Sequence, residues 1–146
     1  MDVYTYLKRE NDRIFDRVET LTQADDNALR KMLLNPLSQQ LPALMTCKGC
    51  TFYLALSDHA PDGPASLANL NLHHDTIRAA LTDLGDAAND GWQAPAEHLR
   101  LAVLRHIDEE EREVFRIARR HLERQMAVDL ARIMATVMAT GELTAA

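Results

Sequence analysis

The sequence predicts an all-α protein. We expect an up-down-up-down antiparallel four-helix bundle of two pseudo-twofold helix pairs, followed by a C-terminal amphipathic helix. Apolar residues recur three or four positions apart, which is the spacing of one helix face. The pattern also occurs twice, because residues 4–21 recur as residues 67–84 and residues 37–53 recur as residues 99–115. Short loops make consecutive helices antiparallel, so two such helix pairs predict a bundle.

The first helix pair is expected in the early half of the chain. Its first helix covers residues 4–21, where apolar side chains form one stripe. The second covers residues 25–56 and begins with aspartate and asparagine residues that are good N-caps. Pro36 and Pro42 fall inside this stretch. Because proline removes an intrahelical hydrogen bond, we expect a kink or a restart there, with Asn35 as the cap and Pro36 in the first turn.

The second helix pair follows a loop over residues 59–64, which proline and glycine indicate. Ser66 is expected to cap the third helix, whose stripe covers residues 67–84. Residues 89–91, with the sequence Asn-Asp-Gly, break the chain again. The fourth helix is then expected over residues 95–121, with a proline in its first turn.

Methionine and leucine side chains form a fifth amphipathic stretch over residues 126–138, which Gly141 is expected to end. We therefore divide the chain into a four-helix bundle at residues 1–121 and a C-terminal helix with a short tail at residues 122–146. This helix packs on the bundle or forms a contact with a second copy or another protein, because its apolar face would otherwise be a larger exposed patch than most monomers carry.

Composition indicates a soluble protein. The chain has 146 residues, 47% hydrophobic residues and a net charge of −6 without long single-sign blocks. These features argue against a nucleic-acid partner and against an anionic membrane surface. No apolar run approaches the roughly 18 residues of a membrane span, and the start MDVYTYLKREND is too charged for a secretory signal. We expect a cytoplasmic protein.

Three residues form a candidate metal site. His106 and Glu110 are four apart and therefore share a helix face, which is the apolar face of Val103 and Val114. His74 occupies an apolar-stripe position of the third helix. Two imidazoles and a carboxylate form the ligand set of mononuclear non-haem Fe(II). The alternative interpretation is a polar patch in the core whose groups are satisfied by hydrogen bonds.

Four segments carry a resemblance to a known family. They are YLKRENDRI, FYLAL, HHDTI and HIDEEEREVF, and the last combines a histidine, a glutamate four positions on and an aromatic residue nine positions on. In these segments, over nearly all of residues 1–120, the chain resembles the hemerythrin-like, or histidine-histidine-glutamate cation-binding, domains. The resemblance implies a left-handed four-helix bundle around a non-haem di-iron centre that handles oxygen, nitric oxide or redox signals. His74, His106 and Glu110 match ligand positions of that family.

Three other ligand positions of the family are substituted. Asn11 and Leu44 stand where histidines are expected, and Lys48 stands where a bridging glutamate is expected. Leucine cannot bind a metal, and lysine brings a positive charge to the place of a cation. We therefore expect no di-iron centre, and either no cofactor or a single Fe or Zn ion. We also expect Lys48 to serve as the countercharge of Glu110.

The remaining cysteines and histidines give weaker signals. Cys47 is one turn from Leu44 and is a possible fourth ligand. Cys47 and Cys50 form either a redox pair or, as is more common for free cysteines, fillers of the core. His73 is expected to face solvent. Ordinary surface positions are expected for the other three histidines: His59, His98 and His121.

The residues leave three hypotheses for function. The first is a hemerythrin-like bundle that has lost di-iron chemistry and serves as a binding, sensing or interaction module with at most one weakly held metal. The second is a mononuclear iron or zinc protein that uses His74, His106 and Glu110. The third is a structural partner protein with a vestigial polar patch. The sequence contains no phosphate-binding loop and no nucleophile with a base at a catalytic spacing, so we favour a role other than catalysis.

Overall fold

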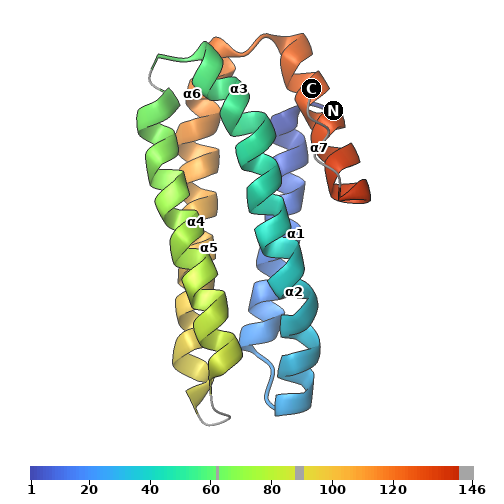
Figure 1. Ribbon diagram of the computed structural model, residues 1–146, viewed down its shortest axis with the longest axis vertical. Coiled ribbons are helices and arrows are strands. Elements are labelled where there is room, and N and C mark those ends of the chain that lie inside the picture. The colour runs from blue at the N-terminus through green and yellow to red at the C-terminus, as the bar shows by residue number, and fades with distance from the viewer. Residues whose placement is uncertain (62, 88–90, 142–146) are drawn as a thin grey trace.

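The computed structural model describes residues 1–61, 63–87 and 91–141. Four helical rods run alternately up and down, and a fifth helix lies against one end of the bundle beside the N-terminus (Figure 1). The elements are α1 (Val3–Thr22), α2 (Asn27–Lys48), η1 (Gly49–Tyr53), α3 (Leu54–His59), α4 (Gly63–Asp86), α5 (Gln93–Glu109), η3 (Glu110–Val114), α6 (Phe115–His121) and α7 (Arg124–Thr140). The second rod consists of α2, a short π-helical segment η1 and α3, and the fourth consists of α5, a second such segment η3 and α6.

The predicted fold class is confirmed. The described residues form an antiparallel helical bundle with an additional C-terminal helix. Asp2 caps α1 by accepting a hydrogen bond from the backbone N–H of Thr5, and Asp26 caps α2 in the same way through Leu29. Gly141 ends α7 in the left-handed conformation, with φ of 71°. Within the described residues, no helix combines the length and the apolar character that crossing a membrane requires.

Two predicted helix boundaries are wrong. Helix α2 is continuous through Pro36 and Pro42, so it does not restart at Asn35. Each proline costs an intrahelical hydrogen bond and about 3 kcal/mol, and the packing of the buried leucine face of α2 offsets that cost. Helix α4 begins at Gly63, which places Ser66 inside the helix rather than at its cap. Within the predicted breaks, Asp62, Asn89 and Asp90 lie outside the described residues.

The two π-helical segments preserve the internal repeat. Segment η1 directly follows Lys48, and η3 begins at Glu110, which is the residue that corresponds to Lys48 in the second half. A π-helical turn accommodates one more residue than an α-helical turn and often occurs at functional sites. Both repeats therefore carry the same local distortion beside the same position, although one repeat has a lysine there and the other a glutamate.

The core consists of two apolar clusters separated by a polar layer. One cluster contains Leu7, Phe52, Leu70 and Val114, and the other contains apolar side chains about two to three turns away on the same four rods. Between the clusters the four rods place the buried polar side chains of the described residues: Asn11, Lys48, His74, His106 and Glu110. We call these five residues the polar layer.

Helix α7 is part of the folded unit. It packs on α1, α2 and η1, and its inward face buries Met134 completely. The same face contributes further apolar side chains to the first cluster, namely Ala127, Leu130 and Val137. This packing covers most of the apolar stripe that we predicted for the C-terminal helix.

Replacing Met134 should therefore destabilise the whole protein. We expect Met134→Ala to lower the free energy of unfolding by about 2–5 kcal/mol, because it opens a cavity between α7 and the bundle. The neighbouring Ile133→Ala is the matched control and should cost much less, since Ile133 is 42% exposed. Urea unfolding followed by circular dichroism measures both. Equal, small losses would indicate that α7 unfolds independently.

Candidate functional site

Each member of the polar layer comes from a different rod, except for two neighbours on the fourth. Asn11 lies in α1 and Lys48 is the last residue of α2. His74 lies in α4, while His106 in α5 and Glu110 at the start of η3 are one turn apart. All five side chains are at most 4% exposed. The helical spacing that builds the apolar core thus brings five polar groups to one level of the bundle.

Lys48 lies at the centre of this layer. Its Nζ donates to Asn11 Oδ1 at 2.8 Å and to Glu110 Oε1 at 3.0 Å, and it lies 3.2 Å from His106 Nε2. An ammonium group has three N–H donors, so these three acceptors satisfy it completely. The third bond requires His106 to carry its proton on Nδ1. The ion pair expected between Lys48 and Glu110 is therefore present.

Glu110 accepts hydrogen bonds at both of its carboxylate oxygens. Its Oε1 accepts from Lys48 and from Asn11 Nδ2 at 2.8 Å, and its Oε2 accepts from the Tyr53 hydroxyl. Burial by itself would raise the pKa of Glu110, but the Lys48 charge, the neighbouring His106 and the two other hydrogen bonds lower it to about 2. Glu110 is thus a carboxylate held ionised in the interior by a fixed internal cation.

The two imidazoles are neutral and incompletely bonded. Their ring centroids lie 4.8 Å apart. Burial and then the Lys48 charge lower the pKa of His74 to about 4 and hold the pKa of His106 well below its usual value. His74 Nε2 and His106 Nδ1 have no hydrogen-bond partner among the described residues. The layer therefore contains one strong ionic network and, beside it, a His74 Nε2 and a His106 Nδ1–H without a hydrogen-bond partner among the described residues.

Tyr53 is a site residue that the sequence analysis missed. Its hydroxyl donates to Glu110, and its ring stacks on His74 with centroids 5.8 Å apart. Burial and then the Glu110 charge raise the pKa of Tyr53 well above its usual value, so it remains a donor. The only sequence signal is its position in the FYLAL segment, five residues after Lys48, where η1 turns it towards the layer.

The other candidates lie outside this network. Cys47 is buried in the first apolar cluster, with Sγ 3.9 Å from the carbonyl oxygen of Met134, and burial raises the pKa of its thiol to about 11. Leu44 packs in the second cluster. Cys50 is exposed, and neither cysteine forms a disulfide. Within the described residues, no contact supports Cys47 as a metal ligand or Cys47 and Cys50 as a redox pair. Both roles stay predictions.

The expectation that His73 faces solvent is wrong. Its side chain is only 17% exposed, and its Nε2 lies 3.3 Å from Glu109 Oε2. Its ring also meets the His106 ring edge-on, with centroids 6.0 Å apart. Close packing of α4 on α5 covers it. Among the remaining histidines, His59 and His98 are exposed as expected, whereas His121 is half-buried.

Comparison with known proteins establishes the class of this bundle. The chain matches the hemerythrin HHE cation binding domain over residues 2–118. Because that match covers most of the chain, the protein belongs to this family of cation-binding domains. Neither the curated proteins nor the solved structures gave a significant match. Helix α7 lies beyond the matched residues.

The donors of the polar layer do not fit a pair of metal ions. On the basis of the sequence resemblance, six positions of this chain correspond to ligands of the family. Of these, Leu44 and the Lys48 ammonium offer no lone pair, and Asn11 offers only an amide oxygen that already accepts from Lys48, which leaves His74, His106 and Glu110. Among the described residues, no group of three or more histidine, cysteine, aspartate or glutamate side chains is arranged to hold a metal ion. Two unit charges 4 Å apart interact by about 4 kcal/mol at an effective dielectric near 20, so a divalent ion beside Lys48 would face about twice that repulsion.

Removing one partner of the central ion pair should cost more than removing both. We expect Lys48→Met to lower the free energy of unfolding by about 3–5 kcal/mol, because Glu110 is left charged and buried. The double variant Lys48→Met with Glu110→Gln should lose much less than the sum of the two single variants. Lys8→Met is the control, since Lys8 makes only exposed ion pairs that are worth little. Additive losses across the cycle would contradict the proposed pairing.

Stability should also depend on the protonation of His74. Unfolded His74 binds a proton below pH 6.5, whereas the folded residue does so only near pH 4. Within that window the unfolded state binds more protons, so acidification from pH 6.5 to 4 should lower the free energy of unfolding by on the order of 2 kcal/mol. His74→Gln should flatten the profile, and His98→Gln, at an exposed position, should not. Parallel profiles for His74→Gln and the wild type would contradict this assignment.

Proposed function

We propose that this protein is a hemerythrin-family bundle that has lost di-iron chemistry and acts as a binding, sensing or interaction module. One observation carries the proposal, namely the position of the Lys48 ammonium within 3.2 Å of Asn11 Oδ1, Glu110 Oε1 and His106 Nε2. The lysine supplies internally the positive charge that a carboxylate in the core needs.

The contacts of Lys48 support the interpretation that this lysine has taken the place of a metal ligand and is built into the structure. All three of its N–H groups are bonded, and Asn11 uses its amide oxygen for Lys48 and its amide nitrogen for Glu110 and Glu111. The donor and the acceptor of a neutral imidazole point away from each other across the ring, whereas the amide oxygen and nitrogen of Asn11 both reach this layer. Asn11 and Lys48 therefore form a matched substitution, and the polar layer stabilises the bundle without an external ion.

A single weakly held ion is the second candidate. The observation that favours it is the proximity of two neutral imidazoles, His74 and His106, whose ring centroids are 4.8 Å apart, together with a His74 Nε2 that has no hydrogen-bond partner among the described residues. With Glu110 these residues form the set of two histidines and one carboxylate that suits iron or zinc. Because Glu110 and His106 Nε2 already bond to Lys48, such an ion would bind only after the ammonium moved away.

Metal content per chain tests the proposal. Protein purified without chelator and exposed anaerobically to excess Fe(II) should retain less than one equivalent after desalting. The triple variant Asn11→His, Leu44→His and Lys48→Glu should retain about two, because it restores the substituted donors. Lys31→Glu on α2 is the control for the charge change, since Lys31 is exposed, and it should behave as the wild type.

Two irons per chain in the wild-type protein would contradict the proposal. One tightly bound ion that is lost in His106→Ala and in His74→Ala would favour the mononuclear candidate instead. A folded triple variant that binds no second ion would contradict the alignment of the two repeats.

A further inference from the structure

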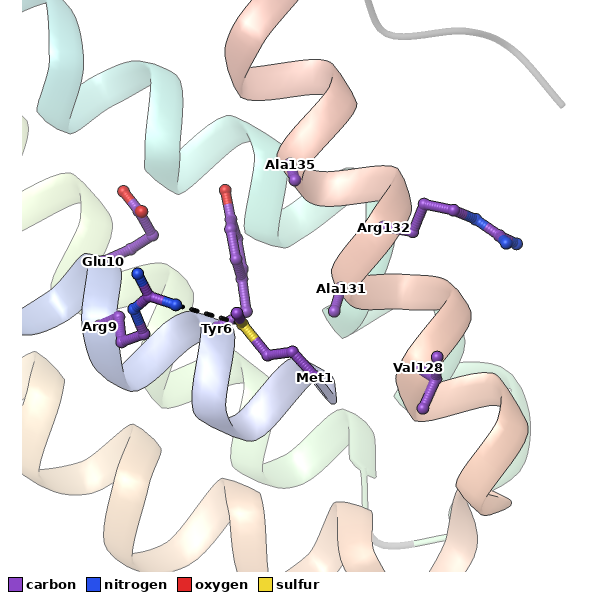
Figure 2. A pocket seen from close by; sticks show the side chains of 8 residues that line it. All are labelled: Met1, Tyr6, Arg9, Glu10, Val128, Ala131, Arg132 and Ala135. Carbon is purple, nitrogen blue, oxygen red and sulfur yellow. Dashed lines mark hydrogen bonds between the residues drawn. The ribbon is translucent and has the colours of Figure 1, made fainter.

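A groove runs between α1 and α7, away from the polar layer. It consists of two adjacent hollows of about 390 and 430 Å³ that share Tyr6, Glu10 and Ala135 in their linings. Figure 2 shows Tyr6 and Glu10 rising from α1 on one side of the first hollow, with Ala131 and Ala135 on the α7 side. Hollows of this volume are typical of small-molecule sites in proteins.

The walls of the groove are mainly apolar. Helix α7 presents alanines four residues apart, at Ala131, Ala135 and Ala139, and their small side chains leave the space between the helices open. At the far end the second hollow is lined by Ile14, Leu44 and Met138. The groove therefore offers a long apolar surface that the packing of α7 on α1 does not fill.

Arginines of α1 follow the same groove. Arg9, Arg13 and Arg17 are four residues apart and so lie along one helix face over about 12 Å. Arg13 pairs with Glu10 at 3.2 Å, and Arg17 donates to the Gln40 side chain. Within the described part of the chain, no carboxylate lies within 4.0 Å of Arg9 or Arg17. This edge is positive in a chain whose net charge is −6.

We propose that the groove binds a single-chain anionic amphiphile, namely a free long-chain carboxylate. Its hydrocarbon chain would lie along Tyr6, Ala131 and Ala135, and its carboxylate would meet Arg17 at the more polar end, since Arg13 is already paired with Glu10. The lining is smaller than the roughly 20–30 residues that each side of a stable protein interface contributes, which favours a small ligand over a protein partner.

Tyr6 completes the chemistry of the groove. Burial, and then the Glu10 charge, raise the pKa of its hydroxyl to about 12, so the group stays protonated in neutral solution and remains a hydrogen-bond donor. It lines both hollows, and Figure 2 shows its ring rising from α1 beside the first of them. Its lining contains none of the five residues of the polar layer, and the site lies partly on α7, outside the residues that match the family.

Calorimetric titration with dodecanoate below its micelle concentration tests this inference. We expect saturable binding of one molecule per chain, and binding of the uncharged dodecanol at least about tenfold weaker. Ala135→Trp should fill the groove and abolish binding. Arg17→Gln should lower the affinity for dodecanoate to about the affinity that the wild type has for dodecanol. The controls Ala79→Trp on α4 and Arg105→Gln on α5 alter exposed residues elsewhere and should bind as the wild type.

Three outcomes would overturn the inference. The first is binding that does not saturate or that is absent in the folded wild-type protein. The second is equal affinity of Ala135→Trp and Ala79→Trp for dodecanoate. The third is a dimer, detected by sedimentation, that Ala135→Trp dissociates while dodecanoate fails to bind. That outcome would assign the α7 groove to a second copy of the chain. Circular dichroism checks that each variant is folded. We expect these changes to leave metal content as in the wild type, which separates this test from that of the polar layer.

Discussion

The ion pair between Lys48 and Glu110 is the constraint on which the interior of this bundle depends. A carboxylate with no exposed surface is costly unless a positive charge and hydrogen bonds compensate it. In this chain the compensation comes entirely from side chains, through Lys48, Asn11 and Tyr53. The second half of the repeat supplies the carboxylate and both imidazoles, and the first half supplies the cation and the amide that orients it.

The rest of the core is arranged around that pair. An apolar cluster lies on each side of the polar layer, so water is kept from the ammonium and the carboxylate. The lower effective dielectric strengthens their attraction. The π-helical segments next to Lys48 and at Glu110 belong to the same arrangement, because they adjust the direction of the side chains that follow, including Tyr53. Helix α7 then closes the first cluster and leaves the groove along α1.

Much of this arrangement could be predicted from residue spacing. Periodicity identified the rods, and the internal repeat placed Lys48 opposite Glu110 because residues 48 and 110 occupy equivalent positions. Residue spacing left open whether α2 is kinked or restarts at Pro36 and Pro42, because the outcome depends on tertiary packing that offsets a local cost there. The contact of Tyr53 and the cover over His73 depend on helix rotation and on the packing of neighbouring rods, which one-dimensional spacing does not fix.

The central claim is that an ammonium group occupies the place of a metal ion. A crystal structure of the wild-type protein grown with excess Fe(II), with anomalous data collected at the iron edge, tests it most directly. We predict continuous density for Lys48 Nζ at hydrogen-bond distance from Glu110 and no pair of anomalous peaks in the polar layer. Two iron peaks bridged by Glu110, with Lys48 turned towards solvent, would contradict the account.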